Sequence, residues 1–307
     1  MSGKNVTEVR LADAEGIALA ARILESGGVV AVPTETVYGL AARADSAEAV
    51  ARIYAAKGRP DFNPLIVHVR GLEQAAEYAE FSLMARALAE AHWPGPLTLV
   101  LPRRADAALA PAVTAGLPTV ALRAPAHSAM RALLERLAFP LAAPSANRSG
   151  FISPTTPAHV LASLEGRIDM VLDGGATTAG VESTIVAVRD DGSVEELRPG
   201  PLQFRARGVG IETSIEAPGQ LASHYAPGKP VRLNAVKAEH DEFLIGFGAV
   251  TGDCTLSASG DVIEAASRLY GCLHEAARAR HPRIAVAPVP EEGVGRAIND
   301  RLRRAAA

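Results

Sequence analysis

Six short polar stretches of this sequence carry side chains that bind anions, and each stands at or just after the end of an apolar run. The first is PTETVYG at residues 33–39, which follows the apolar residues 29–32. The others are KGRPDFNPLIVH (57–68), TVALRAP (119–125), APSANRSGFISPTT (143–156), GVESTIV (180–186) and ELRPGP (196–201). Ligands of open α/β sheets bind at strand ends, where loops converge. The pattern therefore predicts one pocket with several cations and many hydroxyls.

Taken singly, most of these residues have plain structural explanations. Lys57 and Arg59 at the end of a helix would complement the helix dipole. His68 inside an apolar strand is typical of a core histidine, and PSAN is a common turn composition. Arg123 is harder to explain in this way. A guanidinium buried within a strand is strongly unfavourable unless an anion pairs with it.

The elements that must position these residues alternate along the chain. Apolar residues at helical spacing predict helices over residues 13–26, 46–57, 82–92, 127–137 and 157–164, with Asp13, Ser46 and Thr156 as caps. Strand-like runs between the helices include VVAVP, PLIVHV, LTLVL, TVALRA, PLAAP, DMVLD and STIVAV. Interleaved helices and strands indicate an α/β fold. Because some strands follow each other without a helix, we expect a mixed sheet.

The character of the chain changes after about residue 208. Residues 209–228 are rich in Gly, Pro and Ser and have no sustained period, which is typical of a linker. Residues 229–307 resume the α/β pattern, with predicted helices over 261–280 and 291–304. We therefore expect a first domain at 1–208, a linker at 209–228 and a small second domain at 229–307.

The composition excludes several classes of protein. Hydrophobic residues make up 48%, charged residues 21%, and the net charge is -3, which is unlike a protein whose whole surface binds nucleic acid. The sequence contains neither a Gly-x4-Gly-Lys-Ser/Thr loop nor a His-Glu-x-x-His motif. We find no signal-peptide core and no run of ~20 apolar residues, so we expect a cytoplasmic protein without membrane association. Cys254 and Cys272 lack Cys-x-x-Cys spacing, and we expect reduced thiols.

The motifs resemble one family when they are taken together. PTETVYGL, the KGRP segment followed by NPLIVH, and PSANRSG are similar to the YrdC/Sua5 family. The tail, with LASHYAP and GVGRAINDRLRRAA, resembles the second domain of the longer, Sua5-type members. The resemblance covers nearly the whole chain. It implies a YrdC-like twisted mixed open sheet with helices, followed by a linker and a small Rossmann-like α/β Sua5 domain.

The resemblance also implies an activity, that of L-threonylcarbamoyladenylate synthase, a nucleotidyltransferase. Such an enzyme joins L-threonine, bicarbonate and ATP and releases pyrophosphate; its product supplies the threonylcarbamoyl group for adenosine 37 of tRNAs that read ANN codons. Mg²⁺ would be carried by ATP oxygens and water, without a dedicated protein site. The expected partners are the downstream threonylcarbamoyl transferase, in a transient contact, and tRNA, in a weak one.

Site roles follow from the resemblance and from the chemistry of these substrates. Lys57 and Arg59 would neutralise the triphosphate and act as the catalytic residues. Arg123 would bind the threonine carboxylate, because its planar fork matches two oxygens. The rest of the threonine would be surrounded by Thr36, His68, Ser183 and the backbone of Ala143. Lys57 and Arg59 would also bind the nucleotide. The other residues of this nucleotide site would be Asn63, Thr119, Ser145, Asn147, Ser153, Arg198 and Tyr225.

Two further expectations concern the neighbours of the ligands. Tyr225 in the linker would close over the nucleotide as a lid that excludes water from a hydrolysable product. Glu35 would face away from the pocket or cap its own loop, because a carboxylate beside a triphosphate would repel it.

Two alternative functions stay open from the sequence. The cationic residues could grip the phosphodiester backbone of tRNA or double-stranded RNA in a binding module. The balanced charge and the aromatic content of 4% argue against RNA as the main ligand. The second alternative is a related enzyme of the same fold that forms a carbamoyl adenylate for another acceptor.

Overall fold

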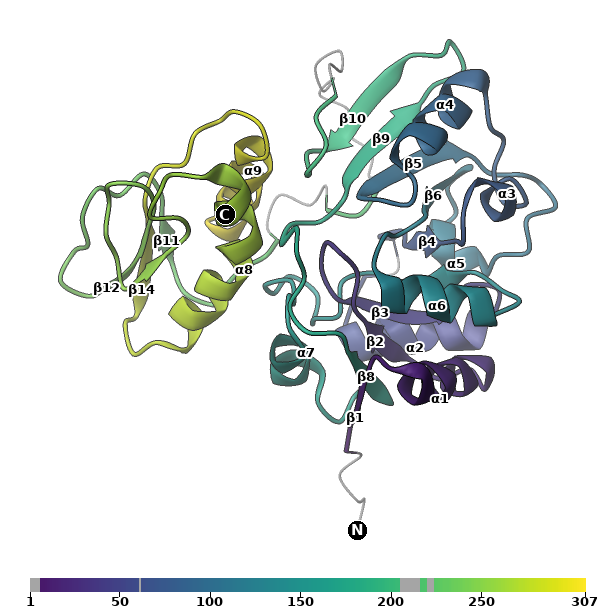
Figure 1. Cartoon of the computed structure of the whole chain (residues 1–307), viewed down its shortest axis with the longest axis horizontal. Helices are drawn as coiled ribbons and strands as arrows, with labels where there is room; N and C mark the ends of the chain where they lie inside the picture. The colour runs from purple at the N-terminus through teal and green to yellow at the C-terminus, as the bar shows by residue number, and fades with distance from the viewer. Residues whose placement is uncertain (1–5, 61, 205–215, 220–223) are drawn as a thin grey trace.

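The computed structural model describes residues 6–60, 62–204, 216–219 and 224–307. A larger unit is built on one long mixed sheet, and a smaller unit lies beside it (Figure 1). The helices of the larger unit are α1 (Ala14–Glu25), α2 (Ala47–Lys57), α3 (Leu72–Ala75), α4 (Leu83–His92), α5 (Pro111–Thr114), α6 (Ser128–Arg136) and α7 (Pro157–Leu164).

The helix starts follow from the capping side chains in the sequence. Asp13 accepts a hydrogen bond from the backbone N–H of Gly16 at the start of α1, and Ser46 accepts one from Ala49 at the start of α2. Thr156 does the same for α7, where Pro157 occupies the first position. Each of these caps satisfies a helix N–H that has no partner within the helix. The predicted starts of these helices are confirmed.

The long sheet has the strand order β1-β8-β2-β3-β7-β4-β6-β5-β9-β10. Its strands are β1 (Glu8–Leu11), β2 (Val30–Val32), β3 (Gly39–Arg43), β4 (Ile66–His68), β5 (Leu97–Pro102), β6 (Thr119–Arg123), β7 (Leu141–Ala142), β8 (Met170–Asp173), β9 (Thr184–Val188) and β10 (Val194–Arg198). Parallel pairs such as β4·β6 and β5·β9 stand beside antiparallel pairs such as β2·β3 and β5·β6. The predicted mixed α/β sheet is confirmed.

Helices cover both faces of this sheet, and the side-chain alternation of the strands decides which residues each face buries. Val30 and Val32 of β2 pack with α1 and α6 on one face. Ala31, between them, belongs to the cluster on the other face, which includes α2, α4, α5 and α7. A strand that is buried on both sides must be apolar at every position. This explains the uninterrupted apolar run before residue 33.

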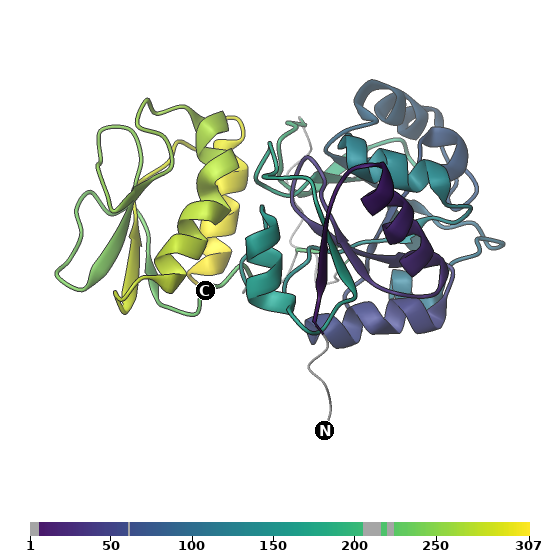
Figure 2. The same ribbon diagram turned by 60° about the horizontal axis from the view of Figure 1, so that its bottom comes forward.

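The smaller unit contains a parallel sheet with the order β11-β14-β12-β13. Its elements are β11 (Val231–Arg232), β12 (Glu242–Gly246), β13 (Cys254–Thr255), α8 (Val262–Arg278), β14 (Arg283–Val286) and α9 (Gly295–Ala305). Helices α8 and α9 lie on the side of this sheet that faces the larger unit, and α8 runs next to α7 (Figure 2). Rings of His159 on α7 and His274 on α8 stack with centroids 3.8 Å apart.

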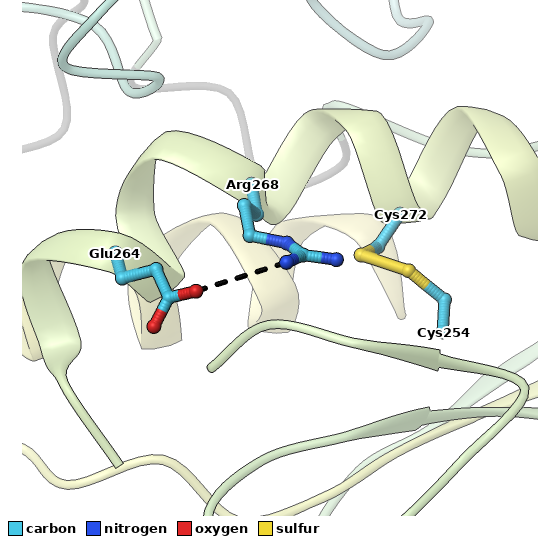
Figure 3. The surroundings of a disulfide bond; sticks show 4 residues. All are labelled: Cys254, Glu264, Arg268 and Cys272. Carbon is cyan, nitrogen blue, oxygen red and sulfur yellow. Dashed lines mark ion pairs between the residues drawn. A yellow bond between two sulfur atoms is a disulfide. The ribbon is translucent and has the colours of Figure 1, made fainter. Parts of the chain in front are cut away.

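The expectation of two reduced thiols is wrong for this structure. Cys254 on β13 and Cys272 on α8 form a disulfide (Figure 3). Their Cα atoms are 6.0 Å apart, within the range that a disulfide spans. The fold brings them together by packing α8 over the strand, and this contact has no local signature in the sequence.

Among the described residues, no helix combines the length and apolarity needed to cross a bilayer. The predicted linker at 209–228 lies partly outside the described residues, which include only 216–219 and 224–228 of it. Tyr225 and its neighbour His224 belong to the described part, and both are buried.

Candidate active site

The candidate site is a pocket at the ends of several inner strands of the long sheet. Strands β4 and β6 are parallel, so His68 and Arg123, which face each other in register, both stand at the carboxyl ends of their strands. Strand β5 runs antiparallel to β6 and parallel to β9, which brings the start of β9 to these strand ends. The pocket is lined by Thr34, Thr36, Val37, Gly39, Arg59, Ile66, His68, Arg123, Ala143, Pro144, Ser145, Glu182, Ser183, Arg198, Pro218, Gly219, His224 and Tyr225.

The turn after β2 delivers Thr36 to this pocket. The Thr34 hydroxyl accepts hydrogen bonds from the backbone N–H groups of Thr36 and Val37, each at 3.2 Å. It also lies 2.9 Å from the Thr36 hydroxyl. Gly39 then starts β3, where an added Cβ would lie 3.2 Å from the Cβ of Ala143. Thr34 and Thr36 therefore have two roles: they stabilise the turn by hydrogen bonds, and they line the pocket.

Arg123 is anchored by three protein groups on the pocket wall. Its Nη1 donates to the Thr36 hydroxyl at 2.9 Å, and its Nε donates to the carbonyl of Gly95 at 3.2 Å. Its Nη2 pairs with Oε1 of Glu35 at 2.5 Å. A guanidinium has five N–H donors, so these contacts leave two N–H groups for a ligand.

We predicted that Glu35 faces away from the pocket or caps its loop, and its side chain is absent from the pocket lining. One carboxylate oxygen accepts from the backbone N–H of Ala126 at 3.0 Å, and the other pairs with Arg123. Burial opposes the charge on Glu35, but the charge and hydrogen bond of Arg123 outweigh it and hold the carboxyl pKa below its usual value. The negative charge of Glu35 is thus balanced by the arginine that its carboxylate holds in place.

Two further arginines in the pocket form no ion pair with a carboxylate among the described residues. Arg59 donates to the carbonyls of Asn63 and Pro64, at 3.2 and 2.9 Å. Arg198 donates to the Ser183 carbonyl at 3.1 and 2.9 Å and to its hydroxyl at 3.0 Å. Burial lowers the pKa of Arg59 to about 10 and also lowers that of Arg198, yet both remain cations at neutral pH.

The remaining lining residues are mostly neutral at neutral pH. Burial lowers the pKa of His68 to about 3, so its imidazole carries no charge. The Ser183 hydroxyl is 2.8 Å from the Thr98 hydroxyl. The backbone N–H of Ala143 is already used by the carbonyl of Ile66 at 3.0 Å. The pocket therefore offers hydroxyls and arginines to an anion, and a neutral ring beside them.

Several predicted site residues do not reach the pocket. Lys57 is buried behind it, where its Nζ donates to the backbone carbonyls of Ser145 and Asn147, both at 2.6 Å, and burial lowers the pKa of this amine well below its usual value. The Asn147 amide donates to Arg148 and Phe151 carbonyls, and the hydroxyl of Ser153 donates to Glu182. These side chains hold the loop that carries Ser145, rather than lining the cavity themselves.

Asn63 and Thr119 also lie outside the pocket lining. Asn63 is buried, and its backbone carbonyl accepts from Arg59. Thr119 begins β6 while Arg123 ends it, so the two lie at opposite ends of this strand. Thr119 lines a different surface hollow, together with Pro102 and Arg189. For Thr119 the predicted common pocket is therefore wrong in this structure.

The chain matches two family models that together cover nearly its whole length. The model Sua5_yciO_yrdC, described as telomere recombination, matches residues 22–200, and the model for the C-terminal domain of threonylcarbamoyl-AMP synthase matches residues 193–307. The chain belongs to the Sua5/YciO/YrdC family. It has the family's two-domain, Sua5-type organisation.

Individual relatives of this family agree over most of the chain. A threonylcarbamoyl-AMP synthase of Bacillus subtilis is 39% identical over 94% of this chain and 92% of its own. One of Pyrococcus abyssi is 38% identical over 94% of this chain and 93% of its own. The crystal structure of P. abyssi Sua5 complexed with L-threonine superposes with a TM-score of 0.87, at 36% identity over 98% of this chain and 97% of that one.

Two titratable residues of the pocket lining, His224 and Glu182, were not assigned a site role from the sequence. His224 precedes Tyr225, and burial lowers its pKa to about 3. Glu182 precedes Ser183 and is buried at the pocket wall. The signal for His224 was its place beside the predicted lid residue. Nothing in the sequence near Glu182 marks it as a pocket residue, because most of its hydrogen-bond partners come from the second domain.

Among the described residues, no group of three or more His, Cys, Asp or Glu side chains is placed to hold a metal ion. Glu182, which lines the pocket, and Glu35, which pairs with the lining residue Arg123, are both engaged with arginines.

Proposed function

We propose that this chain is an L-threonylcarbamoyladenylate synthase. The observation that carries the proposal is the pair Arg59 and Arg198, which face the pocket without a carboxylate partner among the described residues. Burying a cation without an anion is strongly unfavourable, so this pocket is built for an anionic ligand. The relatives named threonylcarbamoyl-AMP synthase and the L-threonine-bound structure of one of them support the choice of ligands.

The threonine would lie against Arg123. The two free N–H groups of its guanidinium would take the carboxylate, while Thr36, His68, Ser183 and the backbone at Ala143 would surround the remaining atoms. A neutral His68 beside the site does not repel the amine. The amine must be unprotonated to form a bond to the carbon of bicarbonate, with loss of water, and so to give a carbamate.

The nucleotide would lie against Arg59, Ser145 and Arg198. A carbamate oxygen then attacks the α-phosphorus, the bond to the bridging oxygen breaks, and pyrophosphate leaves with its electron pair. Activation of bicarbonate by ATP before it meets the amine is the alternative order. No protein nucleophile is needed in either case. The protein's contribution is positioning and charge stabilisation, and positioning alone can be worth up to ~7–11 kcal/mol. Mg²⁺ would travel with the ATP oxygens.

Lys57 takes a different part from the one predicted. It would act by fixing the loop at 145–147 rather than by touching phosphate, because both of its described hydrogen bonds go to backbone carbonyls of that loop. Asn147 and Ser153 would support the same wall. The transfer to tRNA, the transferase partner and a cytoplasmic location remain predictions, as does the division at residues 208 and 228.

Tyr225 would serve as the lid. It is buried at the pocket and adopts a left-handed backbone conformation with φ of 64°, which is unusual for a tyrosine and typical of functional sites. The free space between the lining residues is about 50 Å³, far below the ~300–1,000 Å³ of ligand clefts. A nucleotide could therefore enter only if the part of the pocket wall that contains Tyr225 moves.

The test is to incubate the protein with ATP, Mg²⁺, bicarbonate and labelled L-threonine and to follow the labelled adenylate and pyrophosphate. We expect both products, and neither when threonine is omitted; replacing it with serine tests the specificity. Tyr225→Ala should retain less adenylate, because water reaches the product. Failure to form the labelled adenylate in the complete mixture would overturn the proposal, and unchanged ATP binding and adenylate yield in Tyr225→Ala would overturn the lid.

A further inference from the structure

A buried carboxylate of the pocket wall is held mainly by the second domain. Glu182 stands just before β9 and lines the pocket next to Ser183. One of its oxygens accepts from the Ser153 hydroxyl at 2.6 Å. The Tyr270 hydroxyl of α8 contacts both oxygens at 3.0 and 2.8 Å, and Nε of Arg301 on α9 donates to one at 2.8 Å. Both helices lie on the side of the small domain that faces the larger unit (Figure 1).

Arg301 is completely buried between the two domains. Its Nη1 donates to the Pro199 carbonyl at 2.9 Å and to Asp300 at 2.8 Å. Its guanidinium carbon lies 5.5 Å from the centroid of the Tyr225 ring. Its Nη2 has no hydrogen-bond partner among the described residues. One side chain of the second domain thus contacts a pocket carboxylate, a backbone group of the first domain and the predicted lid.

The charge of Glu182 lies between two arginines with different surroundings. Burial opposes the charge, but the charges of Arg301 and Arg198 outweigh it and lower the pKa of Glu182 to about 2. Arg301 makes the direct ion pair. Arg198 instead binds Ser183 and Pro218 and keeps its place in the pocket lining. Without Arg301, the buried carboxylate would take Arg198 as its partner.

We propose that Arg301 is a positioning residue of this active site: by neutralising Glu182 from the second domain, it leaves Arg198 free to meet the anionic nucleotide. The inference deepens the proposed function and rests on it. Arg301 itself is absent from the pocket lining, so its effect must pass through Glu182, Arg198 and the ring of Tyr225.

The experiment compares Arg301→Gln with Arg303→Gln on the same helix. Arg303 is exposed and pairs with Glu291, which makes it a matched control for the loss of one arginine from α9. We expect Arg301→Gln to weaken ATP binding by tenfold or more in calorimetry, with a matching rise in KM for ATP and a smaller change in KM for threonine. Arg303→Gln should stay within twofold of the wild type.

A charge-balanced variant distinguishes positioning from general loss of structure. Glu182→Gln together with Arg301→Gln removes both charges, so Arg198 has no carboxylate to capture, and ATP affinity should return to within threefold of the wild type. Arg301→Lys, which keeps the charge, should bind ATP between the wild type and Arg301→Gln. Melting temperatures accompany every measurement. If Arg301→Gln does not fold, the double variant decides alone: a folded double variant with ATP affinity still tenfold reduced overturns the proposal.

The outcomes also separate this inference from the proposed function. If the wild type binds ATP but forms no adenylate, while the variants keep the expected order of ATP affinities, the synthase proposal fails and the role of Arg301 stands. If the wild type forms adenylate and Arg301→Gln matches Arg303→Gln, the role of Arg301 fails alone.

Discussion

The ion pair between Glu35 and Arg123 allows the stability role of Arg123 to be separated from its role in binding. The side chains of the pair are 13% and 4% exposed. Truncating Arg123 to alanine leaves the carboxylate without its cation in a mostly buried position. Breaking a buried pair in this way costs about 3–5 kcal/mol. Glu35 keeps some solvent contact, so we expect about 3 kcal/mol for Arg123→Ala, at the lower end of that range.

Adding Glu35→Gln to Arg123→Ala should recover much of this loss, because the uncompensated charge disappears. We expect the double variant to be more stable than Arg123→Ala by about 2 kcal/mol, and the coupling energy follows when the effect of Glu35→Gln alone is also subtracted. The assay is urea unfolding at pH 7 of the wild type, both single variants and the double variant. Equal stability of Arg123→Ala and the double variant would show that an uncompensated charge on Glu35 does not destabilise Arg123→Ala.

Threonine binding should follow a different order from stability. Calorimetry should detect no threonine binding to Arg123→Ala or to the double variant, because both lack the guanidinium fork. Glu35→Gln alone should gain more thermal stability from threonine than the wild type does, since the ligand carboxylate would then compensate a buried cation that has lost its own partner. Threonine binding by the more stable double variant would refute the assignment of Arg123 to the carboxylate.

Three further predictions test other parts of the fold. Burial lowers the pKa of His68 to about 3 in the folded protein. When the pH falls, the imidazole of the unfolded chain therefore becomes protonated before that of the folded protein. The free energy of unfolding is unaffected by this residue above pH 6.5 and falls between pH 6.5 and 3. At pH 5 the loss is about 2 kcal/mol, and His68→Gln should flatten that part of a urea-unfolding pH profile. Reducing the disulfide, whose cysteines are separated by 18 positions, should lower the unfolding free energy by about 3 kcal/mol; a Cys254→Ser, Cys272→Ser variant should show no response to dithiothreitol. Lys57→Met should destabilise the protein by about 2 kcal/mol, because two buried carbonyls lose their donor, and should weaken ATP binding more than threonine binding; unchanged denaturant and ATP titrations would contradict this.

Much of the fold could be predicted because local chemistry determines it. Side-chain caps such as Ser46 and Thr156 fix helix starts within the sequence itself. Strand β3 was not predicted, since Gly39 follows a turn sequence and the alanines after it have no strand preference of their own. Pairing with β2 and β7 makes this segment a strand, and such pairing is not visible in the sequence.

The site was harder to predict because a side chain's direction depends on distant loops. Lys57 at the end of α2 has the chemistry of a phosphate ligand, yet the loop at 145–147 lies where it satisfies the amine first. The sequence alone already separates Thr119 from the end of its strand at which Arg123 stands. Thr119 stands four positions from Arg123 in one strand, and at about 3.3 Å per residue the two are on the order of 13 Å apart.

The charges around the pocket explain how a site with one carboxylate in its lining and another paired with a lining arginine could still bind anions. Glu35 is neutralised by Arg123 from within the first domain, and Glu182 by Arg301 from the second. Arg59 and Arg198 are then left with carbonyl and hydroxyl partners only, as far as the described residues extend. Removing the second domain's arginine would leave an acid beside Arg198 and lower the pocket's positive potential without changing any residue that lines it. If the proposed synthase binds its nucleotide here, the second domain would set the charge that the nucleotide meets.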